Sequence, residues 1–254
     1  MSIGKTFWQE SGEDYVRYRP TYPPELALAL ASAAPSRRLA VDVGCGSGQL
    51  SALLAAHFDH VHASDVSANQ IANATIHPAI VYREGSAEAI AVEDGTADLV
   101  AAGQAAHWFD LASFYREARR IARPGGVIAL VTYGVLEVEG PAQARVHDFY
   151  WRDIHPFWPE GRAHVENGYR DFDFPFPPVP MPALAIERVW TASHFMNYCG
   201  TWSAAKRAAA HGRADILETM AGDLEKLLGP AGTMAIRWPI SIRAGYLNHA
   251  EEVA

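Results

Sequence analysis

The sequence predicts an α/β fold in which helices cover both faces of a doubly wound, mostly parallel sheet. Strand and helix patterns alternate between Leu39 and Thr132, and the connections between strands are too long for hairpins. In addition, the glycine-rich stretch 44–48 lies where a buried strand ends and a helix begins. With 254 residues, 49% of them hydrophobic, the chain can form one such domain and a cap.

Charge and composition exclude several classes of protein. The chain has 21 basic and 29 acidic residues, a net charge of −8 and no basic cluster, which argues against nucleic acid as a partner. Two cysteines, Cys45 and Cys199, make a disulfide framework implausible and favour a reducing, cytoplasmic compartment. Met1–Phe7 lacks the apolar core of a signal peptide, and no apolar run reaches about 18 residues, so no membrane segment is expected.

The first half of the chain alternates strands with helices. Pro24 suits the first turn of a helix that continues to Ala34, because that position does not use a backbone N–H. Ser67 and Asp110 are suitable N-caps for two later helices. Strands are expected at Leu39–Val43, Val61–Ser64, Ile80–Arg83, Ala97–Ala102 and Val127–Thr132, and helices over Gly48–Phe58, from Ser67, and from Asp110 to about Ala122.

The second half has a different composition, which favours a cap or substrate wall. Residues 149–176 hold nine of the 27 aromatic residues, and 175–182 hold five of the 16 prolines. Further elements are expected as a strand at Ile186–Thr191, helices at Thr201–His211 and Arg213–Leu228, and a strand over Met234–Ile242. Pro239 cannot donate to a ladder, so the last strand should be bulged or unpaired there.

These patterns divide the chain into four parts. Residues 1–36 would form an N-terminal lid and first helix, and 37–133 a cofactor-binding core. Residues 134–185 would be the cap insertion, and 186–254 would supply strands and helices that complete the sheet.

The glycine-rich stretch predicts a nucleotide-type cofactor site. Alternate glycines let the backbone approach a ligand closely, and Asp42 ends the strand that precedes them. A dinucleotide fingerprint requires a small residue where Gln49 stands, and a P-loop requires a lysine, yet none occurs between Lys5 and Lys206. Cys45 has no cationic sequence neighbour, so a space-filling thiol is favoured over a nucleophile. A strand–helix turn with glycines for packing alone remains an alternative.

Polar residues at other strand ends extend this site. Asp65 follows the second strand, 19 residues after Gly46, where a carboxylate can accept the hydroxyls of a ribose, although loop or cap chemistry is an alternative. The segments 86–88 and 104–108 and Tyr133 follow the next three strands. Because the carboxyl ends of parallel strands meet at one edge, all of these should line a single crevice.

Aromatic residues near the N-terminus predict either a lid over the ligand or a packing cluster. Tyr15, Tyr18 and Tyr22 recur at helical spacing among arginines, although Pro20 interrupts any helix there. The residues alone leave both alternatives open.

Five segments together resemble the class I S-adenosylmethionine-dependent methyltransferase superfamily. They are Tyr-Val-Arg-Tyr-Arg-Pro-x-Tyr-Pro at 15–23, Asp-Val-Gly-Cys-Gly-Ser-Gly-Gln at 42–49, Ser-Ala-Glu at 86–88, Gln-Ala-Ala-His-Trp at 104–108 and Thr-Trp-Ser-Ala at 201–204. They also resemble a narrower group, the trans-aconitate methyltransferase-like enzymes of small molecules. The resemblance is strong over 15–133 and thin over 140–200. It implies a Rossmann-like sheet of seven strands, the last antiparallel, and S-adenosylmethionine as the cofactor.

At the methionine end of that cofactor, the resemblance implies contacts with Gly44, Cys45 and Gly46. Asp42 would order their loop, and Gln104 would lie beneath the methionine moiety. This end of the site would therefore be built by the loops after the first and fourth strands.

At the nucleoside end, the resemblance implies that Asp65 binds the ribose and Val66 contacts the adenine. Ser86, Ala87 and Glu88 would line the edge of the adenine. The resemblance also favours the lid, formed by Tyr15, Tyr18 and Arg19, with Arg19 as a partner of the cofactor carboxylate. The expected cofactor site is completed by Gln49, Gln70 and Ala105.

The acceptor side is less defined. His107 is a candidate general base, but a structural histidine that holds its loop is the alternative. Trp108 and Tyr133 could form walls of the acceptor site or belong to the core. An acidic acceptor could pair with arginines of the capping half, namely Arg152, Arg170 and Arg207. No metal is expected, because the capping-half histidines His147, His155 and His164 lack metal-site spacing.

The predicted function is therefore methyl transfer from S-adenosylmethionine to a small molecule, at a carboxylate or hydroxyl oxygen. One alternative is a nicotinamide-dependent oxidoreductase on a similar sheet, which Gln49 disfavours. Another is a protein that binds the cofactor without catalysing a reaction.

Overall fold

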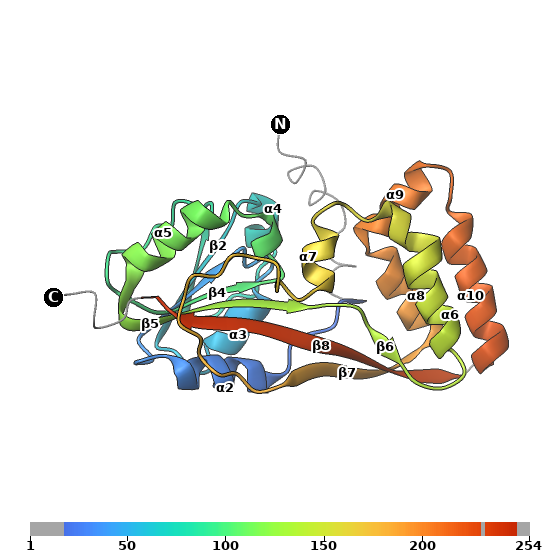
Figure 1. The fold of residues 1–254 in the computed structure, drawn as a ribbon, viewed down its shortest axis with the longest axis horizontal. Helices are drawn as coiled ribbons and strands as arrows, with labels where there is room; N and C mark the ends of the chain where they lie inside the picture. Colours follow the sequence, from blue (N-terminus) through green and yellow to red (C-terminus); the bar gives the residue numbers. More distant parts are fainter. Residues whose placement is uncertain (1–17, 230–231, 248–254) are drawn as a thin grey trace.

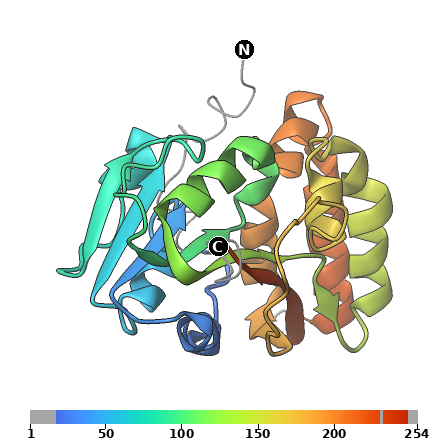
Figure 2. The same cartoon turned by 60° about the vertical axis from the view of Figure 1, so that its left-hand side comes forward.

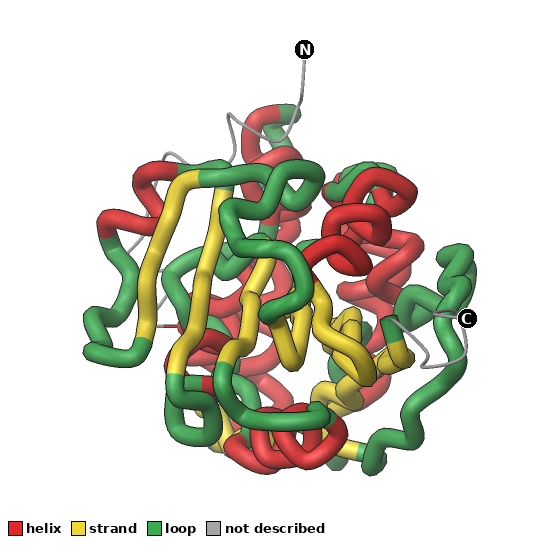
Figure 3. Tube along the Cα trace, turned by 90° about the vertical axis from the view of Figure 1, so that its left-hand side faces the viewer, coloured by secondary structure: helices red, strands yellow, loops and turns green. Residues whose placement is uncertain are grey.

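An eight-stranded sheet forms the centre of the protein, for which a computed structural model describes residues 18–229 and 232–247. Five strands run parallel: β1 (Leu39–Val43), β2 (His60–Asp65), β3 (Ile80–Glu84), β4 (Ala97–Gly103) and β5 (Ala122–Tyr133). Their order in the sheet is β3-β2-β1-β4-β5. Figure 3 shows strands of the sheet side by side, with helices beside them. The carboxyl ends of the parallel strands therefore share one edge of the sheet, which confirms the predicted fold class.

The antiparallel part of the sheet is organised by β8 (Thr233–Tyr246). It pairs with β5, with β6 (Glu137–Val138) and with β7 (Leu184–Thr191). The described residues form eight strands instead of seven because the two-residue β6, too short to leave a sequence pattern, joins the edge of β8.

Of the two outcomes predicted for Pro239, a bulge is absent from the ladder with β7, whereas Pro239 is unpaired on the opposite edge of β8. It stays in register opposite Ala185 of β7, between pairs that show no shift. On the other edge of β8, pairing with β5 ends at Ile240 and pairing with β6 begins at Arg237. Pro239 thus lies between those two ladders, where no neighbouring strand requires an N–H donor.

Helices cover both faces of the parallel strands. Helices α2 (Pro24–Ala33) and α3 (Gln49–Leu54) lie on one face and α5 (Leu111–Ile121) on the other (Figure 1). The short α4 (Ala68–Ala72) follows β2. The expected caps are present: the side chain of Ser67 accepts from the Gln70 N–H, and that of Asp110 from the Ser113 N–H, each at 3.3 Å.

A helical cap occupies the side of the molecule away from β3 (Figure 2). Before β7 the chain contributes α6 (Gln143–Asp148), the π-helix η3 (Phe149–Ile154), the short η4 (His155–Phe157) and α7 (Arg162–Glu166). After β7 it contributes α8 (Ala192–Gly200), α9 (Ser203–Ala210) and α10 (Asp215–Leu228). The cap therefore combines the expected insertion with helices that the sequence assigned to completion of the sheet. Helix α8 was not expected; Thr191 caps it by accepting from the His194 N–H at 3.2 Å.

The cap and the sheet share one hydrophobic core. Tyr198 contacts Trp202 and Trp238 edge-on, with ring centroids 5.3 and 5.6 Å apart. These rings belong to the same buried cluster as Leu26 and Leu30 of α2. The aromatic second half of the chain is therefore packed onto the sheet as part of one folded unit.

Candidate functional site

A cavity of about 410 Å³ opens at the carboxyl ends of the parallel strands. Fifteen of the residues that line it were predicted for the site: Arg19, Asp42, Gly44, Cys45, Gly46, Gln49, Asp65, Val66, Gln70, Ala87, Glu88, Gln104, Ala105, Trp108 and Tyr133. Tyr18, Ser86 and His107 are outside this lining, and Tyr15 lies outside the described residues. The strand ends thus gather most of the predicted side chains around one space.

The glycine loop packs closely against the segment that follows β4. Gly44 has φ +69°, and its N–H and that of Cys45 donate to the Ser64 carbonyl at 2.8 and 2.9 Å. A Cβ on Gly44 would lie 2.5 Å from the Cβ of Ala105 and 3.1 Å from the Phe109 ring. Glycine is therefore required here both by the left-handed backbone and by the close approach of another chain segment.

Asp42 is the buried carboxylate behind this loop. It is fully buried, and its Oδ2 accepts from the Ser51 hydroxyl at 2.5 Å. No described side chain or backbone group bonds to Oδ1. Burial, and to a lesser extent repulsion from Asp65, raises the pKa of Asp42 to about 7. Burial also raises the pKa of the Cys45 thiol, which disfavours a thiolate at the same place.

Asp65 connects the glycine loop to the next strand end. Its Oδ2 accepts from the Gly46 N–H and its Oδ1 from the Ser67 N–H, both at 2.9 Å. A carboxylate offers about four acceptor positions, so these two bonds leave capacity for a ligand in the cavity that Asp65 lines. The Asp65 carboxylate can therefore order the glycine loop and accept hydrogen bonds from a ligand at the same time.

The segment after β3 forms another wall. Gly85, Ala87 and Glu88 line the cavity, and one Glu88 oxygen accepts from the Asp110 N–H at 3.1 Å. Val66 contributes a half-exposed apolar side chain from the loop after β2. Apolar side chains together with the carboxylates of Asp65 and Glu88 in one lining are suited to a nucleoside.

Gln104 holds an unusual backbone conformation at the end of β4. Its φ is +57°, one of two positive values among the described non-glycine residues. The side chain is fixed at both ends, because its amide N–H donates to the Tyr133 carbonyl and its amide oxygen accepts from the Thr132 hydroxyl, each at 2.9 Å. Such strain persists where surrounding contacts enforce it, as these two bonds do here.

Aromatic residues and one arginine form the remaining end of the cavity. Tyr22 and Tyr133, both almost fully buried, meet edge-on with centroids 5.8 Å apart. Arg19 donates to the Thr201 hydroxyl at 3.1 Å and lies over the Tyr198 ring. Arg19 is the only basic side chain in the described part of the lining.

Tyr18, predicted as a lid residue, and His107, the candidate base, are outside the cavity lining. The Tyr18 ring packs against His194 of α8. The His107 Nδ1 lies 2.8 Å from the Tyr169 hydroxyl, and burial, with the nearby charge of Arg162, lowers the pKa of His107 to about 3. This geometry suits a histidine that fixes the 104–108 segment better than one that receives a substrate proton.

The proposed arginine partners of an acidic acceptor do not reach the cavity lining. Arg152 instead lies 3.5 Å from Asp148, and Arg170 donates to the Asn167 carbonyl. Arg207 lies in the last turn of α9.

Neither a metal site nor a membrane span is found in residues 18–229 and 232–247. No group of three or more His, Cys, Asp or Glu side chains there could hold an ion. His164 pairs with Asp171, and His155 lies 3.4 Å from Glu166. No helix within the same ranges is long and apolar enough to cross a bilayer.

Six lining residues were not included in the predicted site. They are Tyr22, Ser47, Leu50, Gly85, Gly103 and Phe109. Ser47, Gly85 and Gly103 adjoin predicted positions, so a wider window around each motif would have included them. Phe109 gave no sequence signal, because its place beside Gly44 depends on the turn Ala106–Trp108.

Asp42 and His107 are expected to change the stability of the protein with pH in opposite directions. The folded-state pKa of Asp42, about 7, is above its ordinary value of 3.8, so the free energy of unfolding falls between these values as pH rises. The pKa of His107, about 3, is below its ordinary 6.5, so its contribution rises with pH. Each slope has an upper limit of about 1.4 kcal/mol per pH unit.

Urea unfolding between about pH 4.5 and 6.5 tests this pair. In Asp42→Asn the free energy of unfolding should rise with pH, and in His107→Gln it should fall with pH. In the wild type the two effects partly cancel, so its free energy of unfolding should change less with pH. The same slope in all three proteins would contradict the assignment.

Comparisons with known proteins show that the chain is similar to methyltransferases. The profile of a methyltransferase domain family matches residues 41–130, from β1 to β5. A solved structure from Anaeromyxobacter dehalogenans, described as a type II methyltransferase, is 42% identical, with a TM-score of 0.86 over 91% of this chain and 99% of that one. A protein of Dictyostelium discoideum named as a methyltransferase is 29% identical over 90% of both chains. A malonyl-[acyl-carrier protein] O-methyltransferase of Dechloromonas aromatica is 34% identical over 48% of this chain and 50% of its own.

Proposed function

The chain belongs to the class I S-adenosylmethionine-dependent methyltransferases, and from this premise we propose that it methylates a small-molecule acceptor at a carboxylate or hydroxyl oxygen. The observation that carries the proposal is the single cavity into which the glycine loop, Asp65 and Gln104 converge beside a tyrosine pair. The nicotinamide-dependent alternative is not favoured, since the relatives found are methyltransferases.

The lining fits S-adenosylmethionine in shape and charge. Gly46 lines the cavity, and among the described residues only the Gln70 amide oxygen, at 4.0 Å, lies within 4 Å of its Cβ position, so the backbone is open to a ligand there. The Asp42 Oδ1 is a buried acceptor without a described partner. Three acidic residues, Asp42, Asp65 and Glu88, line the cavity and would complement the sulfonium and ammonium groups of the cofactor. Arg19 would pair with the cofactor carboxylate.

We assign three parts of the cavity to different parts of the reaction. The glycine loop and Gln104 would hold the methionine moiety, while Asp65, Val66, Ala87 and Glu88 would hold the nucleoside. The aromatic end would hold the acceptor and exclude water from it. Its phenols belong to Tyr22 and Tyr133.

When bound, S-adenosylmethionine supplies a methyl group that is already activated by its sulfonium. The protein then contributes alignment of the two reactants, which can be worth about 7–11 kcal/mol. An ionised carboxylate acceptor needs no general base. We therefore assign His107 a positioning role through its bond to Tyr169.

The acceptor class has two sources of support. The hydroxyls of Tyr22 and Tyr133 are polar groups suited to a small oxygen-bearing molecule. The relative from Dechloromonas aromatica is named as an O-methyltransferase. Membership in the trans-aconitate methyltransferase-like group is part of the same proposal.

Calorimetric titration with S-adenosylhomocysteine tests the cofactor site. Wild type should bind, and Asp65→Ala should weaken binding by about a hundredfold, since hydrogen bonds to a charged group contribute about 1.5–3 kcal/mol each. Asp59→Ala is the matched control, because Asp59 is exposed and outside the lining. Unaltered binding by Asp65→Ala would count against the site.

Transfer of labelled methyl groups to a panel of small acids, phenols and amines tests the reaction. We expect turnover on an acid or a phenol. Turnover on any member ends the alternative of a catalytically silent protein. Turnover confined to the amines would contradict the proposed oxygen acceptor.

A further inference from the structure

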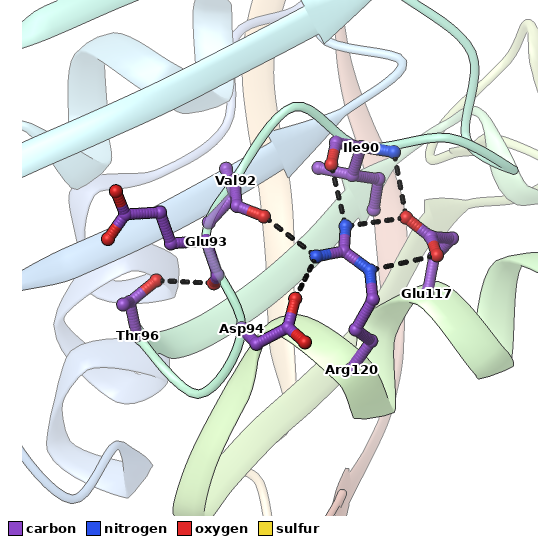
Figure 4. Close-up of polar contacts among 7 residues, drawn as sticks. All are labelled: Ile90, Val92, Glu93, Asp94, Thr96, Glu117 and Arg120. Carbon is purple, nitrogen blue, oxygen red and sulfur yellow. Dashed lines mark hydrogen bonds and ion pairs between the residues drawn. The ribbon is translucent and has the colours of Figure 1, made fainter.

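The loop between β3 and β4 lies along α5, where the side chain of Arg120 makes most of the side-chain hydrogen bonds to the loop (Figure 4). This loop follows directly after the residues that line the nucleoside end of the cavity. Arg120 itself is outside the cavity lining. Any effect it has on a ligand must therefore pass through the loop.

All five N–H groups of the Arg120 guanidinium have acceptors. Nη1 donates to the Val92 carbonyl at 2.9 Å and to Asp94 at 2.5 Å, and Nη2 to the Ile90 carbonyl at 2.8 Å. Glu117 accepts from Nη2 at 2.7 Å and from Nε at 3.0 Å, and it also accepts from the Ile90 N–H at 3.0 Å. The guanidinium thus fixes three separate points of the loop, a geometry that the single ammonium of lysine cannot reproduce.

The backbone of α5 holds the far end of the same loop. The N–H groups of Gly95 and Thr96 donate to the carbonyls of Arg120 and Ile121 at 3.0 and 2.8 Å. The Thr96 hydroxyl closes the turn by donating to the Glu93 carbonyl at 2.8 Å (Figure 4). The loop is therefore attached to α5 at the Arg120 side chain and immediately beyond it.

The other end of the loop reaches the cavity within a few residues. Ala87 and Glu88 line the cavity, and Ile90 follows two residues later. Ala87 and Ile90 are both buried in the hydrophobic cluster that contains Phe114 of α5. Glu88 accepts from the Asp110 N–H at the start of α5. A displacement of Ile90 would consequently move the cavity wall.

We propose that Arg120 is a positioning residue for the nucleoside half of the cofactor: by clamping residues 90–94 onto α5, it holds Ala87 and Glu88 in their binding positions. This inference rests on the proposed function and adds a determinant of cofactor affinity that does not touch the cofactor. It also identifies α5 as the element that sets the position of this wall.

The test compares Arg120→Lys with the matched variant Arg116→Lys. Arg116 lies on the same helix, is exposed and makes a single side-chain bond, to the Ser113 hydroxyl at 2.8 Å. Two quantities are measured well below the unfolding temperature: amide hydrogen exchange of residues 86–92 without ligand, and the Kd for S-adenosylhomocysteine. Arg120→Lys should accelerate the exchange and raise the Kd, each by about tenfold. Arg116→Lys should change neither.

A wild-type Kd in folded Arg120→Lys would overturn the proposal, even if its Tm were lower. If Arg120→Lys does not fold, Asp94→Ala serves instead, since Asp94 is 78% exposed and alanine removes one of the five acceptors. A threefold rise in Kd would then support the proposal, and no change would overturn it. If wild type itself binds no S-adenosylhomocysteine, the proposed function fails, whereas the exchange measurement still reports whether Arg120 fixes the loop.

Discussion

Replacing Gly44 by alanine is expected to weaken binding of S-adenosylhomocysteine by at least about a hundredfold, or about 2.8 kcal/mol. The left-handed backbone at φ +69° costs an alanine about 1–2 kcal/mol. In addition, the new methyl group would lie 2.5 Å from the Cβ of Ala105, which has no rotamer by which to move away. Either the glycine loop or the Gln104–Ala105 segment must shift, and both line the cavity. Calorimetric titration measures the change.

The control Gly212→Ala separates the cost of the left-handed backbone from the effect of the clash with Ala105. Gly212 also has a positive φ, +74°, but nothing lies within 4 Å of its Cβ position, and it is outside the cavity lining. We expect this control to lose stability by about 1–2 kcal/mol and to bind normally. Equal Kd values for wild type and Gly44→Ala would show that the loop is not the methionine cradle.

Asp98→Asn is expected to lower the free energy of unfolding by about 3–5 kcal/mol and Tm by about 10 °C. Asp98 is fully buried at the base of the sheet. Its Oδ1 accepts from the Ser36 hydroxyl at 2.6 Å and lies 2.9 Å from the Arg123 Nε, and its Oδ2 accepts from the N–H groups of Arg38 and Leu39. An amide would place an NH₂ against some of these donors and leave Arg123 without its counterion.

Urea unfolding and thermal scans measure this loss, with Glu137→Gln as control. Glu137 makes an exposed ion pair with Arg237 at 2.8 Å, for which about 0–1 kcal/mol is expected. Because Asp98 is outside the cavity lining, folded Asp98→Asn should bind S-adenosylhomocysteine as wild type does. A loss similar to that of the control would contradict a structural role for this carboxylate.

The parallel half of the fold is predictable because its signals are local. Apolar runs, glycine turns and caps such as Ser67 and Asp110 each mark an element within a few residues. The cap is less predictable, since α8 begins at a capping threonine with no clear apolar period, and β6 is two residues long. These elements depend on partners far away in the chain, which a single sequence does not reveal.

The residues of the candidate site also fall into a group that is predictable from the sequence and a group that is not. Asp42, Asp65 and Gln104 are found from the sequence because strand ends are readable and parallel strands bring them together. His107 and Tyr18 have similar sequence positions, yet their side chains turn toward Tyr169 and His194. Side-chain direction in irregular segments depends on tertiary contacts, so sequence position could not separate these two groups.

Strand β8 has a consequence for synthesis in the cell. Residues 233–246 pair with β5, β6 and β7, yet they leave the ribosome after all of these partners. Until then the edge of β5 over Val127–Tyr133, apolar throughout except for Thr132, has no partner on that side. Exposed strand edges of this kind are templates for intermolecular pairing. The nascent chain should therefore be most prone to aggregation, and most dependent on chaperones, in the interval just before its last strand emerges.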